Sequence, residues 1–218
     1  HVQFYRGYLG LGQNEDPTAI DNIKFFMGYQ LNWMYWRYFM WNYVGRQNDI
    51  EGQGEAQNGN WISGIKFIDK MFGKGDADLM PDDMKNNKAR NEYYFLPFIL
   101  GIVGLVYHYK KDKQDFIVVG LFFFFTGIAI QMYINNTPLQ PRERDYAYVS
   151  TYAFAMWIGL GVLAITNFLN KKMKSASVAA PALATLVALV AVPGLMLAEN
   201  WDDHDRSEKT IAKNHARN

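Results

Sequence analysis

Four consecutive charged residues interrupt an apolar part of the chain, within the stretch TPLQPRERDYAY at residues 137–148. They are Arg142, Glu143, Arg144 and Asp145. Pro138 and Pro141 precede them and would fix the turn that leads to the cluster. Guanidinium groups keep their charge at any pH and bind phosphate through paired hydrogen bonds. Next to a membrane, the cluster predicts a site for a lipid-linked phosphate, with Arg142 and Arg144 as ligands and the two carboxylates orienting them.

The same charges could instead form a knot of ion pairs that pins the loop, with Asp202 or Glu199 as a further partner. Exposed ion pairs contribute only about 0–1 kcal/mol of stability. This small gain favours a functional role for four charges together, but the charge pattern leaves both interpretations open.

A second polar cluster follows in the C-terminal stretch ENWDDHDRSEKTIAKNHARN. Asp202, Asp203, His204 and Asp205 have the side chains of a metal site, but consecutive residues on a helix point in different directions. Only Asp202 and Asp205 would share a face, with Arg206 beside Asp202. We therefore expect no metal, and predict the start of a polar helix whose acidic first turn suits the helix dipole. Asp202, His204 and Arg206 are candidates for supporting the arginine cluster.

Ten of the nineteen residues from 25 to 43 are aromatic. Trp and Tyr prefer the headgroup level of a bilayer. We expect a helix at about 23–44 that lies along or dips into this interface, with Arg37 reaching lipid phosphates. In a second interpretation the rings contact a sugar or an acyl chain, through Trp33, Trp36 and Trp41 together with Arg37. A membrane span is disfavoured here by the polar residues Lys24, Asn32, Arg37 and Asn42.

The composition separates apolar blocks from polar ones. Half of the 218 residues are hydrophobic, yet the mean hydropathy is −0.19. A net charge of +1 gives no reason to expect nucleic acid as a partner, and the lack of cysteine excludes disulfides and thiolate metal sites. The first residue is His, and no signal-peptide pattern follows it, so we expect part of a longer protein.

Four blocks approach or reach the ~20 apolar residues that a membrane-spanning helix needs. They are residues 93–109, 116–134, 147–169 and 178–198. A buried helix of a soluble protein would show a polar face every 3.6 residues, and these blocks show none. We predict an all-α integral membrane protein with an interfacial segment at 1–92, four transmembrane helices within 93–198, and a C-terminal segment at 199–218 that leads to a soluble domain outside this chain.

Within the first segment, residues 45–92 are rich in Gly, Asn and Asp and predict a long extramembrane loop. A loop of this length is usually functional or disordered. Four apolar residues recur in it at helical spacing: Trp61, Ile65, Ile68 and Phe72. They indicate a short amphipathic helix that rests on the membrane or on the protein core.

Lysines give the expected orientation. The links KKDKQ at 110–114 and NKKMKSAS at 170–177 each contain three lysines. Short lysine-rich links belong on the cytoplasmic side of a membrane. The stretch 137–148 and both termini are therefore expected on the extracytoplasmic face.

The stretch TPLQPRERDYAYVSTYAFAMWIGLGVLA resembles a signature of glycosyltransferase family 117, a family of bacterial membrane proteins with protein O-mannosyltransferase-like enzymes. MYWRYFMWNYVGRQND, NWISGIKFID, NEYYFLPFILGIVGL and NWDDHDRS resemble further blocks of the family in the same order. The resemblance covers nearly the whole chain from about residue 29. Its most specific element is PLQPRERDYAY.

The resemblance implies a GT-C type enzyme of the bacterial cytoplasmic membrane. Such an enzyme takes a sugar from a polyprenyl-phosphate donor and transfers it, outside the membrane, to an exported acceptor such as a protein Ser or Thr. No cofactor besides this lipid-linked donor is implied. The chain is similar to the later part of the family's membrane region, so the catalytic base would lie outside it. Arg142 and Arg144 match the arginines that would hold the donor phosphate.

Two other classes compete with this interpretation. A transporter or flippase is disfavoured, because the interiors of the last three blocks contain no ionisable residue that could mark an ion pathway. A non-catalytic subunit could scaffold an envelope or export complex, using the aromatic segment and the long loop to bind membrane partners. In that case the charged cluster would be a structural device.

Overall fold

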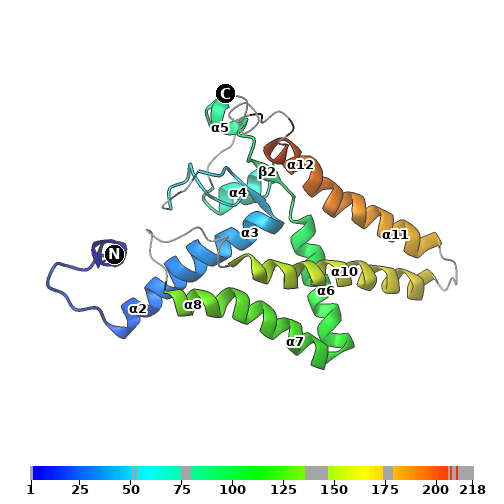
Figure 1. Ribbon diagram of the computed structural model, residues 1–218, viewed down its shortest axis with the longest axis horizontal. Helices are drawn as coiled ribbons and strands as arrows, with labels where there is room; N and C mark the ends of the chain where they lie inside the picture. The colour runs from blue at the N-terminus through cyan, green and yellow to red at the C-terminus, as the bar shows by residue number, and fades with distance from the viewer. Residues whose placement is uncertain are drawn as a thin grey trace.

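Long helices cross one another in the computed structural model, and a small polar unit lies at one end of them (Figure 1). The structure describes residues 2–50, 52, 54–74, 80–135, 147–173, 179–205, 207 and 210. Helices make up most of these ranges, as the sequence predicts.

The aromatic segment forms one continuous helix from Ala19 to Tyr43, which we call the aromatic helix. It consists of α2 (Ala19–Phe25), the π-helical η1 (Phe26–Trp36) and α3 (Arg37–Tyr43). Thr18 and Asp21 form a capping box that starts it, which explains why it begins before the expected residue 23. A short preceding helix, α1 (Val2–Leu9), packs its rings on the rings of α2 and η1.

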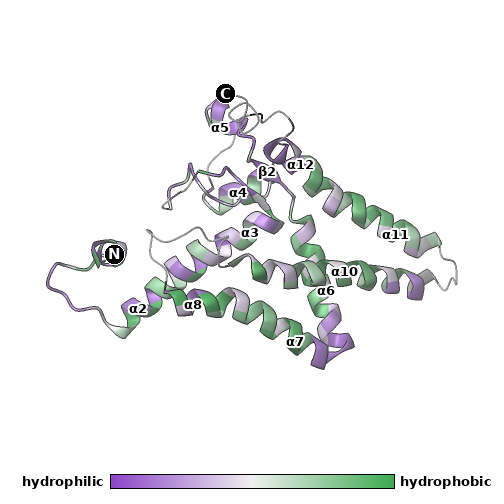
Figure 2. Ribbon diagram, viewed as in Figure 1, coloured by the Kyte–Doolittle hydropathy of each residue, from purple (hydrophilic) through white to green (hydrophobic). Residues whose placement is uncertain are grey.

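Among the described residues, three helices are long and apolar enough to cross a membrane: Lys113–Ile134, Val149–Lys171 and Pro181–His204. The first joins α7 (Lys113–Phe124), η3 (Phe125–Ala129) and α8 (Ile130–Ile134). The second lies in α10 (Val149–Met173). The third consists of α11 (Ala179–Leu189) from Pro181 onward, η4 (Val190–Gly194) and α12 (Leu195–His204). Most of their residues are hydrophobic, as the colouring of the ribbon in Figure 2 shows. The chain thus has the helices of a membrane protein.

The first expected span, 93–109, corresponds to a shorter helix. It forms α6 (Leu96–Lys111), which has 16 residues. Its length of about 24 Å is less than the ~30 Å of a bilayer's hydrocarbon core. The four expected spans are therefore three helices of spanning length and one shorter helix.

Glycines allow α6 to pack closely against α10. A Cβ atom built on Gly104 would lie 1.7 Å from the Trp157 carbonyl oxygen, and one on Gly161 would lie 2.2 Å from the Leu100 carbonyl oxygen. Small residues at such crossings let membrane helices approach one another. A buried hydrogen bond from Trp157 Nε1 to His108 Nδ1, 3.2 Å long, closes the contact.

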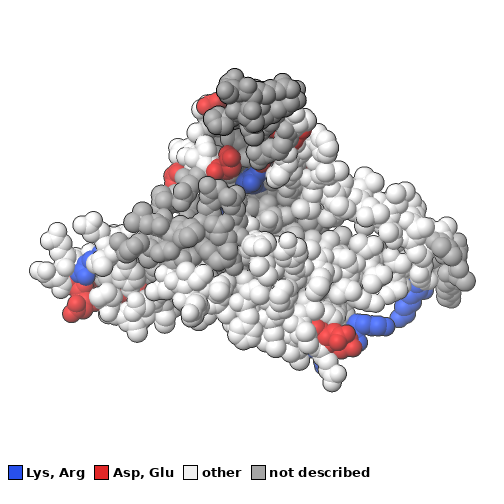
Figure 3. All heavy atoms as spheres, in the orientation of Figure 1, with Lys and Arg blue, Asp and Glu red and all other residues white. Residues whose placement is uncertain are grey.

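The C-terminal parts of α6 and α10 lie at one end of the bundle, where Asn167 Nδ2 donates to the Tyr107 hydroxyl at 2.8 Å. We call this the lysine end, because Lys110, Lys111 and Lys113 lie at the turn between α6 and α7. Figure 3 shows charged side chains at this turn, in the lower right, and a broad uncharged surface over the neighbouring helices. This distribution is typical of helices that face lipid.

The opposite end carries the polar unit, which we call the platform and define as the described residues of 44–95. Its two short strands, β1 (Gly45–Arg46) and β2 (Asn91–Glu92), pair antiparallel, with Gly45 opposite Glu92. Two short helices, α4 (Lys66–Met71) and α5 (Asp82–Lys85), lie between them in the chain. The expected long loop is thus largely a folded unit.

Buried amides hold the platform together. Asn48 Oδ1 accepts the Gly59 and Ile50 backbone N–H groups at 2.9 and 3.3 Å, and Asn48 Nδ2 donates to the Gln57 carbonyl oxygen at 3.1 Å. Asn60 Nδ2 donates to Gln47 Oε1 and to a backbone carbonyl in the same way. Backbone groups that no regular helix or sheet could satisfy find partners here, as buried polar groups require.

Two sequence predictions need correction. The helix expected from Trp61 to Phe72 is only α4, because Trp61 is buried and forms a β-bridge with Arg46 instead. Asp202, Asp203 and His204 form the last turn of α12, not the first turn of a polar helix. The spanning helix continues this far because its end is hydrogen-bonded to the platform, as described below.

Candidate functional site

The charged cluster lies between two described positions, Asn135 at the end of α8 and Ala147 before α10. Arg142, Glu143, Arg144 and Asp145 are outside the described residues, and so is Arg206. The structure therefore bears on the cluster through the residues that flank it.

The aromatic helix is attached to both flanks of this segment. Gln30 Nε2 donates to Asn135 Oδ1 at 2.6 Å. The Tyr35 hydroxyl donates to Ser150 Oγ at 3.1 Å, and the Tyr43 hydroxyl donates to the Thr151 carbonyl oxygen at 2.6 Å. The described residues on both sides of the segment with Arg142 and Arg144 consequently lie beside the same helix.

Burial fixes the protonation of these two tyrosines. It raises the pKa of Tyr35 to about 12, and it also raises the pKa of Tyr43 above its ordinary value. Both hydroxyls therefore remain hydrogen-bond donors over the whole physiological range. No local pattern in the sequence predicts these contacts, since the partners lie more than a hundred residues away.

Three of the four predicted sugar or lipid contacts, Trp33, Arg37 and Trp41, stack on one face of the aromatic helix, and we call this stack the ladder. The Arg37 guanidinium lies over the Trp33 ring at 4.4 Å and the Trp41 ring at 4.7 Å. Its Nη1 donates to the Gly59 carbonyl oxygen at 2.7 Å. Arg37 is only 4% exposed, so it lies between indole rings and the platform instead of reaching headgroups. Trp36, on another face, is 39% exposed and packs on Phe39.

A spacing of four residues between Trp33, Arg37 and Trp41 could have predicted this ladder. Side chains at i, i+4 and i+8 stack on one helix face, and a guanidinium between two indoles gains cation–π attraction from each. The ladder therefore accounts for all three residues without a ligand.

Two further cations surround the ladder. The Arg46 guanidinium lies 6.0 Å from the Trp41 ring, and the Lys74 ammonium lies 4.8 Å from the Trp61 ring. Burial, followed by the positive charge of Arg37, lowers the pKa of Lys74 below its ordinary value. The charge of Arg37 thus reaches Lys74, while Arg46 is paired with Asp203.

The end of α12 is fastened to the platform. Arg46 Nη2 and Asp203 Oδ2 are 3.1 Å apart, and the Glu92 backbone N–H donates to Glu199 Oε2 at 3.0 Å. Asn200 Nδ2 donates to the Tyr93 hydroxyl at 2.6 Å. Sequence reasoning singled out this cluster but missed Asp203 as its ion-paired member.

The two supporting candidates in this cluster occupy different places. Asp202 lines a polar cavity of about 290 Å³ with Arg90 and Glu199. His204 is mostly exposed, and its Nδ1 lies 3.1 Å from the Asn200 carbonyl oxygen. Neither is brought to Asn135 by any described contact.

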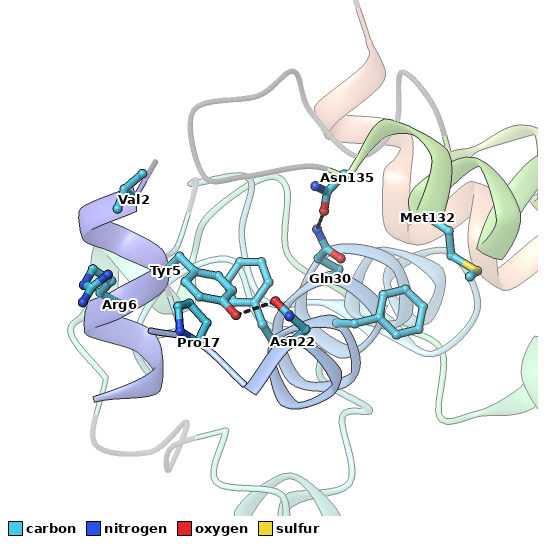
Figure 4. A pocket seen from close by; sticks show the side chains of 10 residues that line it. Val2, Tyr5, Arg6, Pro17, Asn22, Gln30, Met132 and Asn135 are labelled. Carbon is cyan, nitrogen blue, oxygen red and sulfur yellow. Dashed lines mark hydrogen bonds between the residues drawn. The ribbon is translucent and has the colours of Figure 1, made fainter. Parts of the chain in front are cut away.

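A larger open cavity, of about 530 Å³, lies beside Asn135. Figure 4 shows its walls: α1 on one side, the aromatic helix in the centre and α8 on the other. Amide and hydroxyl groups of Tyr5, Asn22, Gln30 and Asn135 face it together with the apolar side chains of Val2, Phe25, Phe26 and Met132. Met132 belongs to a spanning helix and is more than half exposed. The cavity can hold an amphiphile whose polar part meets amides and whose chain reaches the lipid-facing surface.

In the part of the chain that the structure describes, no three His, Asp or Glu side chains are grouped so that they could hold a metal ion. Comparisons with protein-family models, with curated proteins and with solved structures found no match for this chain.

Proposed function

We propose that this chain is the donor-binding part of a bacterial membrane glycosyltransferase. It would take a sugar from a polyprenyl-phosphate donor and transfer it to an exported acceptor, such as a protein Ser or Thr. Arg142 and Arg144 bind the donor phosphate, and Glu143 and Asp145 orient them. The observation that carries the proposal is that both flanks of this segment are attached to the aromatic helix, beside an amphiphilic cavity.

The proposed topology has α6 as a fourth, shorter span and the lysine end in the cytoplasm. The platform, the cavity and the stretch 137–148 are then extracytoplasmic, as are both termini. A lipid-linked sugar would place its polyprenyl chain along α8 near Met132 and its phosphate at the level of Asn135. This geometry agrees with an amphiphile whose polar part lies at the membrane surface.

In the proposed mechanism, a base outside this chain deprotonates the acceptor hydroxyl. The two arginines stabilise the negative charge that develops on the departing lipid phosphate. They would act as fixed positive charges, since arginine does not lose its proton in this pH range.

A non-catalytic membrane subunit is the second candidate. It is favoured by the use of Arg37 and Arg46 in internal contacts, with Gly59, Ala89 and Asp203 as partners. Such a platform would serve as a rigid surface for a partner protein of an envelope or export complex.

The test is to purify the protein in detergent and identify co-purifying lipids by mass spectrometry. The wild type is expected to carry a polyprenyl phosphate or its glycosylated form, and Arg142→Ala/Arg144→Ala is expected to lose it. The matched control, Lys110→Ala/Lys111→Ala at the lysine end, should retain it. If no version carries such a lipid, and the arginine variant loses folding or a partner, the subunit hypothesis replaces the enzyme.

A further inference from the structure

The platform has one surface that does not fit its polar character. Around α4, Phe67 is 78% exposed, Met71 63% and Phe72 53%. Large apolar side chains grouped on a protein surface mark an interaction site. We call this group the α4 patch and define it as Ile65, Phe67, Met71 and Phe72.

Hydrogen bonds hold α4 firmly in this orientation. Asp69, on the buried side of the helix, accepts the Ser63 N–H and Oγ–H groups with Oδ1 at 2.7 and 2.8 Å, and accepts the Gly64 N–H with Oδ2 at 3.1 Å. The rings of Trp61 and Phe72 are in contact, with centroids 5.3 Å apart. The outward direction of Phe67 and Met71 is therefore built into the platform.

The patch is adjacent to the point where α6 begins. The Tyr94 backbone N–H donates to the Ser63 carbonyl oxygen at 3.0 Å, and the Trp61 and Phe95 rings are 6.1 Å apart. Figure 1 shows α4 close to this end of α6. The first residues of α6 also carry exposed apolar side chains, Leu96 and Ile99.

Lysines accompany the apolar side chains. Lys66 and Lys70 are four residues apart and share one edge of α4, while Phe67 and Met71 share the next edge. Short helices with an apolar edge beside a basic edge lie in the headgroup region of anionic membranes. This charge complementarity, with the attachment of the platform to the start of the apolar helix α6, favours a lipid surface over a protein partner.

We propose that α4 is a membrane anchor, in which Phe67 and Met71 insert into the headgroup region and Lys66 and Lys70 attract anionic lipids. The anchor holds the platform on the bilayer surface, at the end of the platform from which α6 begins. It requires no sugar transfer, so it stands or fails separately from the proposed function.

The chain contains no cysteine, so single cysteines can carry a nitroxide label without a background. We would label Phe67→Cys and Met71→Cys, which change exposed residues, in vesicles of phosphatidylcholine and phosphatidylglycerol. Collision rates with oxygen and with a water-soluble nickel chelate then report depth. The controls are Gln57→Cys, on the exposed polar surface of the platform, and Val118→Cys, on the exposed face of α7.

The expected oxygen-to-nickel ratio at 67 and 71 is several-fold above that at 57 and below that at 118. A ratio equal to that at 57 would show that the patch faces water, and shielding from both reagents would show a protein contact; either result overturns the proposal. Lys66→Gln/Lys70→Gln should move the labels toward water in these vesicles but not in pure phosphatidylcholine. An unchanged depth would refute the role of anionic lipid.

Discussion

The platform and the spanning helices differ in which side chains the protein buries. In the platform, Gln47 and Asn48 are each 1% exposed and Ser63 is fully buried. In the spanning helices Lys113–Ile134 and Pro181–His204, only 11% and 6% of the apolar stretch is buried inside the protein. These apolar helices are thus little covered by protein, as is expected of helices that face lipid. Burial within the platform satisfies polar groups, while the buried apolar side chains gather where the aromatic helix packs on its neighbours.

The forces that hold the two regions differ accordingly. Lipid tails are as apolar as leucine, so membrane helices gain little from the hydrophobic effect and associate through close packing. The α6–α10 contact depends on glycine in this way. The platform depends on amide hydrogen bonds, whose loss leaves buried backbone groups without partners.

Substitution of Gly104 by alanine should have the largest effect. The new Cβ atom would lie 1.7 Å from the Trp157 carbonyl oxygen, so α6 and α10 must separate. We expect a loss of about 3 kcal/mol in the free energy of unfolding, measured by circular dichroism during titration of detergent micelles with dodecyl sulfate. Gly159→Ala, on the open face of α10 where a Cβ meets nothing within 4 Å, should change stability by no more than about 1 kcal/mol. Equal effects of the two substitutions would refute glycine-dependent packing.

Substitution of Asn48 by leucine should loosen the platform and leave the bundle unchanged. It removes the partners of two backbone N–H groups and one carbonyl oxygen. We expect a loss of about 2 kcal/mol, or about 30-fold faster hydrogen exchange, confined to peptides from 44–63. Gln57→Leu, whose side chain is exposed, is the control. Faster exchange in α10 as well would show that the two regions unfold together, against the contrast drawn above.

The smallest effect concerns two cations, Arg37 of the aromatic helix and Lys74 of the platform. Removal of the Arg37 charge in Arg37→Met should raise the pKa of Lys74, because that charge lowers it in the folded protein. A lowered lysine pKa means that the folded state binds fewer protons than the unfolded state at pH values between that pKa and 10.5. Stability therefore rises with pH across this window, and the variant should show a shallower rise.

The Lys74 titration can be followed by NMR of methylated lysines in detergent. Arg46→Met is the matched control, since Arg46 is not a cause of the Lys74 shift. A Lys74 midpoint that stays the same in Arg37→Met would mean that burial alone sets its pKa.

The sequence predicts the regions whose structure depends on local pattern. Uninterrupted apolar runs predict the three spanning helices, since hydropathy and length decide whether a helix can cross a bilayer. The density of rings at 25–43 likewise predicts the aromatic helix, although its capping box at Thr18 shifts the start. These features require no knowledge of distant contacts.

The parts that were missed depend on contacts between distant residues. Arg46 and Asp203 are 157 residues apart, and their pairing keeps the acidic end of α12 helical against an unfavourable dipole. The burial of Arg37 could not be predicted from the residues around it, because Gly59 comes from a loop rich in glycine and asparagine. Patterns of three to four residues contain no information on such partners.

The bonds from Tyr35 and Tyr43 to α10 have a consequence for how the protein is made. Tyr43 is separated by 108 residues from its acceptor, Thr151. A ribosome adds about 5–20 residues per second, so the aromatic helix emerges roughly 5–20 s before this acceptor exists. During this interval the rings that later face α10 have no protein surface to cover them. If the apolar helices enter a bilayer, lipid or an insertion factor would have to shelter these rings, and the order of membrane insertion would then be part of the folding problem of this chain.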